Sequence, residues 1–177
     1  MKIYIIRHGQ TDWNLINKIQ GKKDICLNKT GIMQAEKARE KIEKYDFDLI
    51  ICSPLKRAKQ TAEIINHNKN VQIIYDEALM ERGFGNYEGT QINFDENPIS
   101  NLELNVEINN IEPAKQFYDR VSKLLDYIKN NLEDKKILLV THGGTVRAIE
   151  TYFFGTDENG NMPPDILKNC EIREYEF

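Results

Sequence analysis

The chain opens with a short apolar, β-branched run that stops abruptly at a basic corner. The run from Ile3 to Ile6 is typical of a buried strand, and Arg7, His8 and Gly9 follow it at once. Gly9 permits a sharp turn and lets a ligand approach the backbone closely. Ligands of open α/β sheets bind just beyond the carboxyl ends of the strands. We therefore expect Arg7 and His8 to lie at a ligand site.

A second stretch far downstream repeats this pattern. Taken alone, the first stretch also fits a strand that ends in two solvated polar residues. Residues 137–140 form another apolar run, however, and Thr141, His142, Gly143 and Gly144 come directly after it. Two strand-end histidines, each with glycine behind it, are hard to explain as independent accidents. The repeated pattern predicts one site that contains both histidines.

Bulk properties bound the class of protein. A length of 177 residues suggests one domain, spanning 1–177. The 24 basic and 28 acidic side chains give a net charge of −4, which argues against a nucleic-acid or anionic-membrane surface. Cys26, Cys52 and Cys170 are too far apart for a metal or disulfide motif, so we interpret them as reduced packing thiols. Without a transmembrane run or a signal-peptide pattern, the expected location is cytoplasmic.

Strand-like and helical patterns alternate along the chain. Strands are expected at 3–6, 48–52, 71–75, 137–140 and, as an edge strand, 171–177. Helices are expected to begin near residues 12, 30, 53, 113 and 145. The helix near residue 30 is expected to bury Ile32, Ala35, Ala38 and Ile42. Residues 90–111 are polar and asparagine-rich, which indicates a short, mostly irregular, cap-like excursion over the site. The alternation predicts an α/β fold with a mainly parallel sheet covered on both faces.

A helix start directly after the strand at 48–52 brings a further arginine into consideration. Ser53 is expected to be the N-cap and Pro54 the first helical residue. Arg57 lies off the apolar stripe of this helix and near its N-terminus. It would then face the same crevice as His8, together with the positive end of the helix dipole. The alternative is a solvated arginine.

The residues expected at this sheet edge suit an anion. Strand-end loops would gather Arg7, His8, Arg57, Glu81 and His142. The planar fork of arginine matches phosphate oxygens bidentately. Histidines and carboxylates also bind zinc, but the fixed charge of two arginines repels a dication, and no HxH or HExxH spacing is present. We therefore expect neither a metal nor another cofactor.

A bound phosphoryl group would define the chemistry. A neutral histidine can attack phosphorus and become a phosphohistidine. Arg7, Arg57 and a protonated His142 could neutralise the equatorial oxygens. The leaving alkoxide needs a proton, for which Glu81 is the expected donor and Glu88 the competitor.

Motifs along most of the chain resemble, in the right order, those of the histidine phosphatase superfamily, also called the phosphoglycerate mutase-like family. The matching positions are 7–14, Gln20-Gly21, Asp24, Leu27, Gly31, Gln34-Ala35, 53–62, Glu81, Gly85, 87–89 and 141–144. The resemblance implies a phosphoglycerate mutase-like, three-layer α/β/α fold with a mainly parallel mixed sheet. It also explains how Arg7 and His8 share a pocket, since the strand would have ended before His8.

The resemblance implies a role for each matching site residue. His8 would be the nucleophile and Glu81 the proton donor. The phosphate pocket would comprise Arg7, Asn14, Arg57, His142 and Gly143, with Gln20 and Gly21 at its entrance.

The chain departs from the family pattern at a few positions. Thr141 stands where many members have serine, and Glu112-Pro113-Ala114 where many have a Gly-Glu-Ser-like helix start. Both departures are expected to be harmless. The excursion at 90–111 is shorter than the insertions with which mutases enclose a bisphosphate. The phosphatase branch is therefore favoured, and within it the alpha-ribazole phosphatases and broad phosphomonoesterases.

Three hypotheses follow from the sequence. The leading one is a metal-independent phosphatase that hydrolyses a small phosphorylated metabolite through a phosphohistidine. The alternative is a phosphoglycerate mutase that uses the same phosphohistidine. The third is a catalytically silent phosphate-binding module. Loss of Arg7, His8 or His142 would indicate such a module, but all three residues are present.

Overall fold

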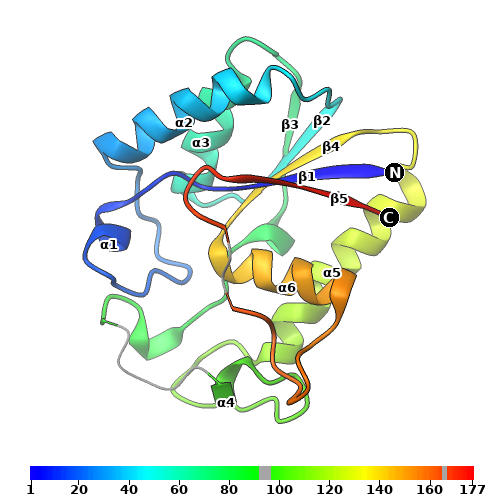
Figure 1. The fold of residues 1–177 in the computed structure, drawn as a ribbon. Helices are drawn as coiled ribbons and strands as arrows, with labels where there is room; N and C mark the ends of the chain where they lie inside the picture. Colours follow the sequence, from blue (N-terminus) through cyan, green and yellow to red (C-terminus); the bar gives the residue numbers. More distant parts are fainter. Residues whose placement is uncertain (92–96, 165–166) are drawn as a thin grey trace.

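The computed structural model describes residues 1–91, 97–164 and 167–177. Within them, five strands form one sheet in the order β3-β2-β4-β1-β5 (Figure 1). The strands are β1 (Lys2–Arg7), β2 (Leu49–Cys52), β3 (Gln72–Tyr75), β4 (Ile137–Thr141) and β5 (Ile172–Glu176). All pairs are parallel except that of β1 with the edge strand β5. The expected mainly parallel, mixed sheet is confirmed.

Helices cover both faces of this sheet. The longer ones are α2 (Lys29–Ile42), α3 (Lys56–Asn66), α5 (Ala114–Asn131) and α6 (Gly143–Phe154). Single-turn elements are α1 (Asp12–Leu15), α4 (Asn97–Ser100) and the 3₁₀ turns η1 (Glu77–Leu79) and η2 (Gly85–Tyr87). Helices α2 and α3 lie on one face and α5 and α6 on the other, which gives three layers (Figure 1).

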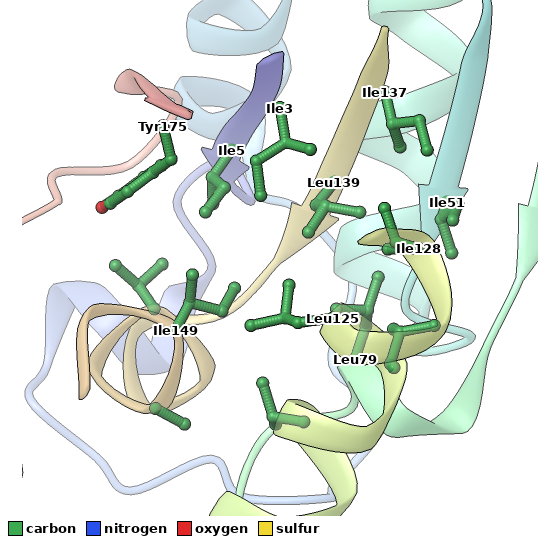
Figure 2. Close-up of a cluster of buried hydrophobic side chains, with 14 of the residues drawn as sticks. Ile3, Ile5, Ile51, Leu79, Leu125, Ile128, Ile137, Leu139, Ile149 and Tyr175 are labelled. Carbon is green, nitrogen blue, oxygen red and sulfur yellow. The ribbon is translucent and has the colours of Figure 1, made fainter. Parts of the chain in front are cut away.

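The alternation of strand side chains divides the core into two clusters. Ile3 and Ile5 of β1 belong to the cluster beneath α5 and α6. Tyr4 and Ile6 point to the opposite face and pack with α2 and α3. Figure 2 shows the first cluster, in which strand side chains meet Leu125 of α5. The central strands are therefore apolar on both faces, and polar side chains gather at their ends.

The register of the two central strands brings the two strand-end histidines together. Arg7 pairs with Thr141, which is also the last residue of its strand. His8 and His142 come next in the chain, and their ring centroids lie 5.1 Å apart. Strand β2 ends beside them, so Ser53 reaches the same edge.

The expected helix start at Ser53 and Pro54 is wrong. Helix α3 begins at Lys56, and its N-cap residue, Leu55, makes no side-chain capping bond. The Ser53 hydroxyl accepts the Leu55 N–H at 3.3 Å and contacts His142 at 2.7 Å. A tertiary partner therefore engages the hydroxyl that local propensity assigns to a cap.

The expected burial of Ile32 in α2 is also wrong. Ile32 is 39% exposed, and Gly31 occupies the buried face in its place, with Ala35, Ala38 and Ile42. The first turn of α2 lies directly against the backbone of Gly9 and Gln10. This contact leaves no space for a side chain, so glycine faces the core there.

The cysteines differ in burial. Cys52 is buried and Cys170 half-buried, as expected of packing thiols, whereas Cys26 is exposed, which corrects that expectation. Within the described ranges, no helix is long and apolar enough to cross a bilayer.

The excursion at 90–111 falls partly outside the described residues, which omit 92–96. Its described part contains α4 and packs against the segment after α6. Leu102 N–H donates to Gly160 at 3.1 Å, and Met162 N–H donates to Ser100 at 3.1 Å. The excursion is thereby tied to the C-terminal part of the chain.

We expect Gly31→Ala to destabilise the protein. An added Cβ would clash with the backbone of Gln10. Alanine gains about 1 kcal/mol of helix propensity over glycine, but backbone atoms cannot rotate away from the clash. The free energy of unfolding, measured with urea, should fall by about 1–3 kcal/mol.

Gly83→Ala is the matched control. A Cβ at Gly83 would meet nothing closer than 3.5 Å, and the backbone there is compatible with alanine. This change should be neutral or should raise the free energy of unfolding by about 0.4–1 kcal/mol. Equal stability of the two variants would contradict the close contact at Gly31.

Candidate active site

A pocket of about 150 Å³ opens at the carboxyl end of β1. Its wall contains Arg7, His8, Asn14, Gln20, Gly21, Arg57 and Glu81, all predicted from the sequence, and also Lys18, Ile19 and Phe84. Among the described residues, the predicted His142 and Gly143 are not part of this wall, and neither is the excursion at 97–111. The excursion also includes 92–96, which lie outside the described residues, so its expected place over the site stays a prediction.

The sequence did not indicate three of these wall residues. Lys18 forms an isolated bridge with Gln91, and the Ile19 N–H donates to Thr90 at 2.9 Å. This pairing between distant loops positions both residues, and their only sequence signal was the neighbouring Gln20-Gly21 motif. Phe84 follows the Glu81 loop and carried no signal.

His8 is a neutral histidine whose tautomer is fixed by the backbone. Its ring is 2% exposed, and Nδ1 lies 2.7 Å from the carbonyl oxygen of Gly9. Because a carbonyl can only accept, Nδ1 carries the proton and Nε2 keeps its lone pair. Burial, followed by the charges of Arg57 and Arg7, lowers the pKa of His8 well below its usual value. The ring thus keeps a lone pair on Nε2 that can attack an electrophile.

Arg57 is a fully buried cation in the pocket wall. Its Nη atoms donate to the carbonyls of Gly21 and Lys23 at 2.8 and 2.7 Å, and its Nε donates to His142 Nδ1 at 3.1 Å. Burial lowers the pKa of Arg57 to about 10, so the group stays charged at neutral pH. The guanidinium orders the 21–23 loop while it supplies positive charge to the pocket.

The expected protonation of His142 is wrong for this state of the protein. Nδ1 accepts from Arg57, so the proton is on Nε2, which donates to Ser53 Oγ at 2.7 Å. Burial and the charge of Arg57 lower the pKa of His142 well below its usual value. His142 therefore acts here as a neutral support for Arg57, next to His8.

Asn14 reaches the pocket because α1 begins with a capping box. Thr11 accepts the Asn14 N–H at 3.2 Å, and Asn14 Oδ1 accepts the Thr11 N–H at 3.1 Å. The pair of bonds fixes the first turn of α1. The oxygen of the Asn14 amide is engaged, which leaves its NH₂ group to face a ligand oxygen.

Gln20 presents a polar atom with no protein partner. Its side-chain oxygen is buried and lacks a hydrogen bond within the part of the chain that the structure describes. A buried polar atom without a partner is unfavourable. A hydroxyl or N–H group of a ligand could donate to this oxygen.

Glu81 is held at the N-terminus of α6. Its Oε2 accepts the Gly144 N–H at 3.0 Å, and its Oε1 accepts the Arg82 N–H at 2.9 Å. These two backbone donors fix the position of the Glu81 carboxyl group in the pocket wall. A Cβ at Gly144 would clash with Glu81, which explains the second glycine after His142.

Arg120 of α5 supports the loop that carries Glu81. It donates to the carbonyls of Ala78, Met80 and Glu81 at 2.7, 2.9 and 3.1 Å. Its Nε also donates to Glu112 at 2.7 Å. Burial opposes the ionisation of Glu112, but the hydrogen bond and charge of Arg120 lower its pKa from the usual value. The atypical helix start after Glu112 therefore keeps an ionic anchor for this loop.

Glu88 has a structural position. Its Oε1 accepts the N–H groups of Lys22 and Phe84 at 2.9 and 3.1 Å. It packs behind Gly21, where an added Cβ would clash with it. Because the described pocket wall contains Glu81 and not Glu88, the geometry favours Glu81 as the acid.

The arrangement of these side chains suits a bound dianion that the Nε2 atom of His8 can attack. Arg7 and Arg57 supply fixed charge, His8 Nε2 supplies a lone pair, and Glu81 can move a proton. In the described ranges, no cluster of three or more His, Cys, Asp or Glu side chains could hold a metal ion.

A sequence profile of the histidine phosphatase superfamily (branch 1) matches residues 3–177. The chain therefore belongs to this family, and its three-layer fold is of the phosphoglycerate mutase-like type.

The relatives include proteins named as phosphatases and proteins named as probable mutases. The chain is 38% identical over 178 residues to the uncharacterized phosphatase PhoE of Bacillus subtilis, covering 99% of this chain and 90% of that protein. It is 28% identical to the probable phosphoglycerate mutase GpmB of Escherichia coli O1:K1, covering 100% of this chain and 85% of that protein. The structure of Bacillus stearothermophilus YhfR superposes with a TM-score of 0.88 at 25% identity, over 99% of this chain and 90% of that chain.

The two neutral histidines predict a pH dependence of stability. Both are depressed in pKa when folded, whereas an unfolded histidine protonates near pH 6.5. The stabilisation is fully present above that pH and is lost as the pH falls towards the folded pKa values, because the unfolded state then binds more protons. The free energy of unfolding should fall by up to about 1.4 kcal/mol per pH unit for each histidine.

Urea unfolding between about pH 8 and pH 5 measures this dependence. His142→Gln should reduce the slope below pH 6.5 by about 1.4 kcal/mol per pH unit, because it removes one of the two groups. A wild-type stability that stays flat over this range would contradict the neutral assignment.

Proposed function

We propose that this protein is a metal-independent phosphatase that hydrolyses a small organic phosphomonoester through a phosphohistidine on His8. The observation that carries the proposal is the hydrogen bond from His8 Nδ1 to the Gly9 carbonyl. This bond leaves the Nε2 lone pair free in a pocket that also contains Arg7, Arg57 and Glu81. The two arginines match the oxygens of a phosphoryl dianion and repel a metal ion.

The reaction takes two steps. In the first, His8 Nε2 bonds to phosphorus, the ester P–O bond breaks, and Glu81 gives its proton to the leaving alkoxide. In the second, Glu81 takes a proton from water, the hydroxide attacks phosphorus, and the P–N bond breaks. Phosphate leaves, and both side chains return to their starting states. Arg7 and Arg57 neutralise the phosphoryl oxygens in both steps.

A mutase that uses the same phosphohistidine is the second candidate, supported by the similarity to GpmB. The higher identity to a protein named as a phosphatase and the short excursion at 90–111 favour hydrolysis. Incubation with 3-phosphoglycerate and a bisphosphoglycerate primer separates the two candidates. Release of inorganic phosphate supports the phosphatase, whereas isomerisation to 2-phosphoglycerate supports the mutase.

We expect the wild-type protein to hydrolyse 4-nitrophenyl phosphate at an undiminished rate after exhaustive chelation with EDTA. His8→Ala should abolish turnover and prevent the trapping of an acid-labile phosphoenzyme from labelled substrate. Loss of activity with EDTA and recovery with a divalent ion would contradict metal independence and favour a metal-dependent mechanism. An inactive wild type that still binds vanadate would instead indicate a silent phosphate-binding module.

Glu81→Gln should affect substrates according to their leaving groups. An alkyl ester leaves as a basic alkoxide and needs the proton, so kcat/KM, which reports only the first step, should fall by the roughly 10²–10⁴-fold typical of general acid catalysis. A 4-nitrophenyl ester leaves as a weakly basic phenolate and should lose much less. Steady-state rates with the two esters measure the difference.

Glu88→Gln is the matched control for the acid, because its carboxylate bonds to the 22 and 84 backbone outside the pocket wall. It should show no dependence on the leaving group. If Glu88→Gln shows the dependence and Glu81→Gln does not, the acid is misassigned. Equal losses with both esters for Glu81→Gln would contradict its role as proton donor.

A further inference from the structure

Gly9 joins two peptide planes that together determine how His8 is held. Its Cα hydrogen faces the first turn of α2, where a Cβ would lie 2.5 Å from the carbonyl oxygen of Gly31. Only glycine fits this approach, yet glycine restricts the backbone least. The planes on either side of Gly9 therefore need hydrogen bonds from elsewhere to keep one orientation.

The first plane, between His8 and Gly9, is held from both sides. Asn169 Nδ2 donates to the His8 carbonyl at 2.8 Å, and the Gly9 N–H donates to Thr61 Oγ1 at 3.0 Å. The Thr61 hydroxyl in turn donates to the Arg57 carbonyl at 2.7 Å. One hydroxyl thus joins the strand-end corner to the helix that carries the buried arginine.

The second plane, between Gly9 and Gln10, carries the carbonyl that orients the imidazole. His8 Nδ1 donates to the Gly9 oxygen at 2.7 Å, and the Gln10 N–H donates to Gln34 Oε1 at 2.8 Å. Rotation of this plane would move the carbonyl away from Nδ1. The ring would then be free to turn and to exchange its tautomer.

We propose that Gln34, Thr61 and Asn169 are positioning residues for His8, which hold the two peptide planes beside Gly9 and so keep the proton on Nδ1 and the lone pair on Nε2. They come from α2, α3 and the segment before β5, and none belongs to the described pocket wall. The proposal rests on the function of His8 proposed above. Each residue acts through the backbone of the nucleophile and not through the ligand.

Thr61→Val is the sharpest test, because valine keeps the shape of threonine and removes its hydrogen bonds. Thr151→Val is its matched control. Thr151 is also buried in a helix, and its hydroxyl donates to the carbonyl of Arg147 four residues earlier at 2.8 Å, as Thr61 does to Arg57. Thr61→Ser keeps the hydroxyl and should restore the wild-type behaviour.

Asn169→Leu tests the other side of the first plane, with Asn66→Leu as its control. Asn66 likewise donates from Nδ2 to a backbone carbonyl, that of Val71 at 2.9 Å, and lies at the far end of α3. Gln34→Met tests the second plane with a side chain of similar length.

The kinetic expectation separates positioning from general damage. Thr61→Val, Asn169→Leu and Gln34→Met should lower kcat by roughly 10–100-fold, as expected for a misplaced nucleophile. Inhibition by inorganic phosphate, which needs the polar groups of the wall but no bond to His8, should stay unchanged. Inhibition by vanadate, which bonds to the histidine nitrogen, should weaken. Losses no greater than those of Thr151→Val and Asn66→Leu, or equal weakening of both inhibitors, would overturn the proposal.

Nuclear magnetic resonance of the ¹⁵N-labelled histidines gives a readout that does not depend on turnover. The chain has 3 histidines, so the His8 signals are assignable by substitution. Wild-type His8 should show a protonated Nδ1 and an unprotonated Nε2, and the three variants a mixture of tautomers. Unchanged His8 signals in all three variants would overturn the proposal, whatever the catalytic activity of the variants. Altered signals in a protein without phosphatase activity would instead leave positioning intact and contradict the proposed function.

Discussion

The buried guanidinium of Arg57 is the constraint on which the site depends. A charge removed from water is tolerated only when its donors are satisfied. Its partners are the carbonyls of Gly21 and Lys23 and the Nδ1 of His142. The first two order the loop at the pocket entrance. The third fixes the tautomer of His142, whose Nε2–H then donates to Ser53 Oγ. One buried cation therefore determines the arrangement of a loop, a histidine and the end of a neighbouring strand.

Close backbone contacts provide the second level of organisation. Gly9 and Gly31 allow the corner after β1 to lie against the first turn of α2, and Gly144 makes room for the Glu81 carboxylate at the start of α6. Each glycine lacks a side chain, and this absence allows two segments to lie at a short distance from each other. The resulting freedom of the backbone is restrained by side chains from elsewhere, as with Thr61 at the Gly9 N–H. Precision at the site thus depends on residues that do not line it.

The sequence predicted the fold and most of the pocket, because strand ends and their polar residues can be read locally. It failed where a tertiary partner overrides local preference. Ser53 looked like an N-cap but contacts His142, and Ile32 looked like core but yields its place to Gly31. Lys18 was missed because its position depends on pairing with a loop distant in sequence. The neutral state of His142 was missed because it depends on burial and on a charge that no local pattern reveals.

The positive charge of the pocket has two effects that work together. Arg7 and Arg57 would attract the phosphoryl dianion of the proposed substrate, and the same charges, with burial, keep His8 unprotonated. A binding site built from protonated histidines would attract the dianion equally well but would lack a nucleophile. A neutral histidine among carboxylates would have a lone pair but would repel the substrate. Arginine satisfies both demands because it stays charged even when it is buried. The separation of roles between arginine and histidine is therefore a consequence of their different basicities.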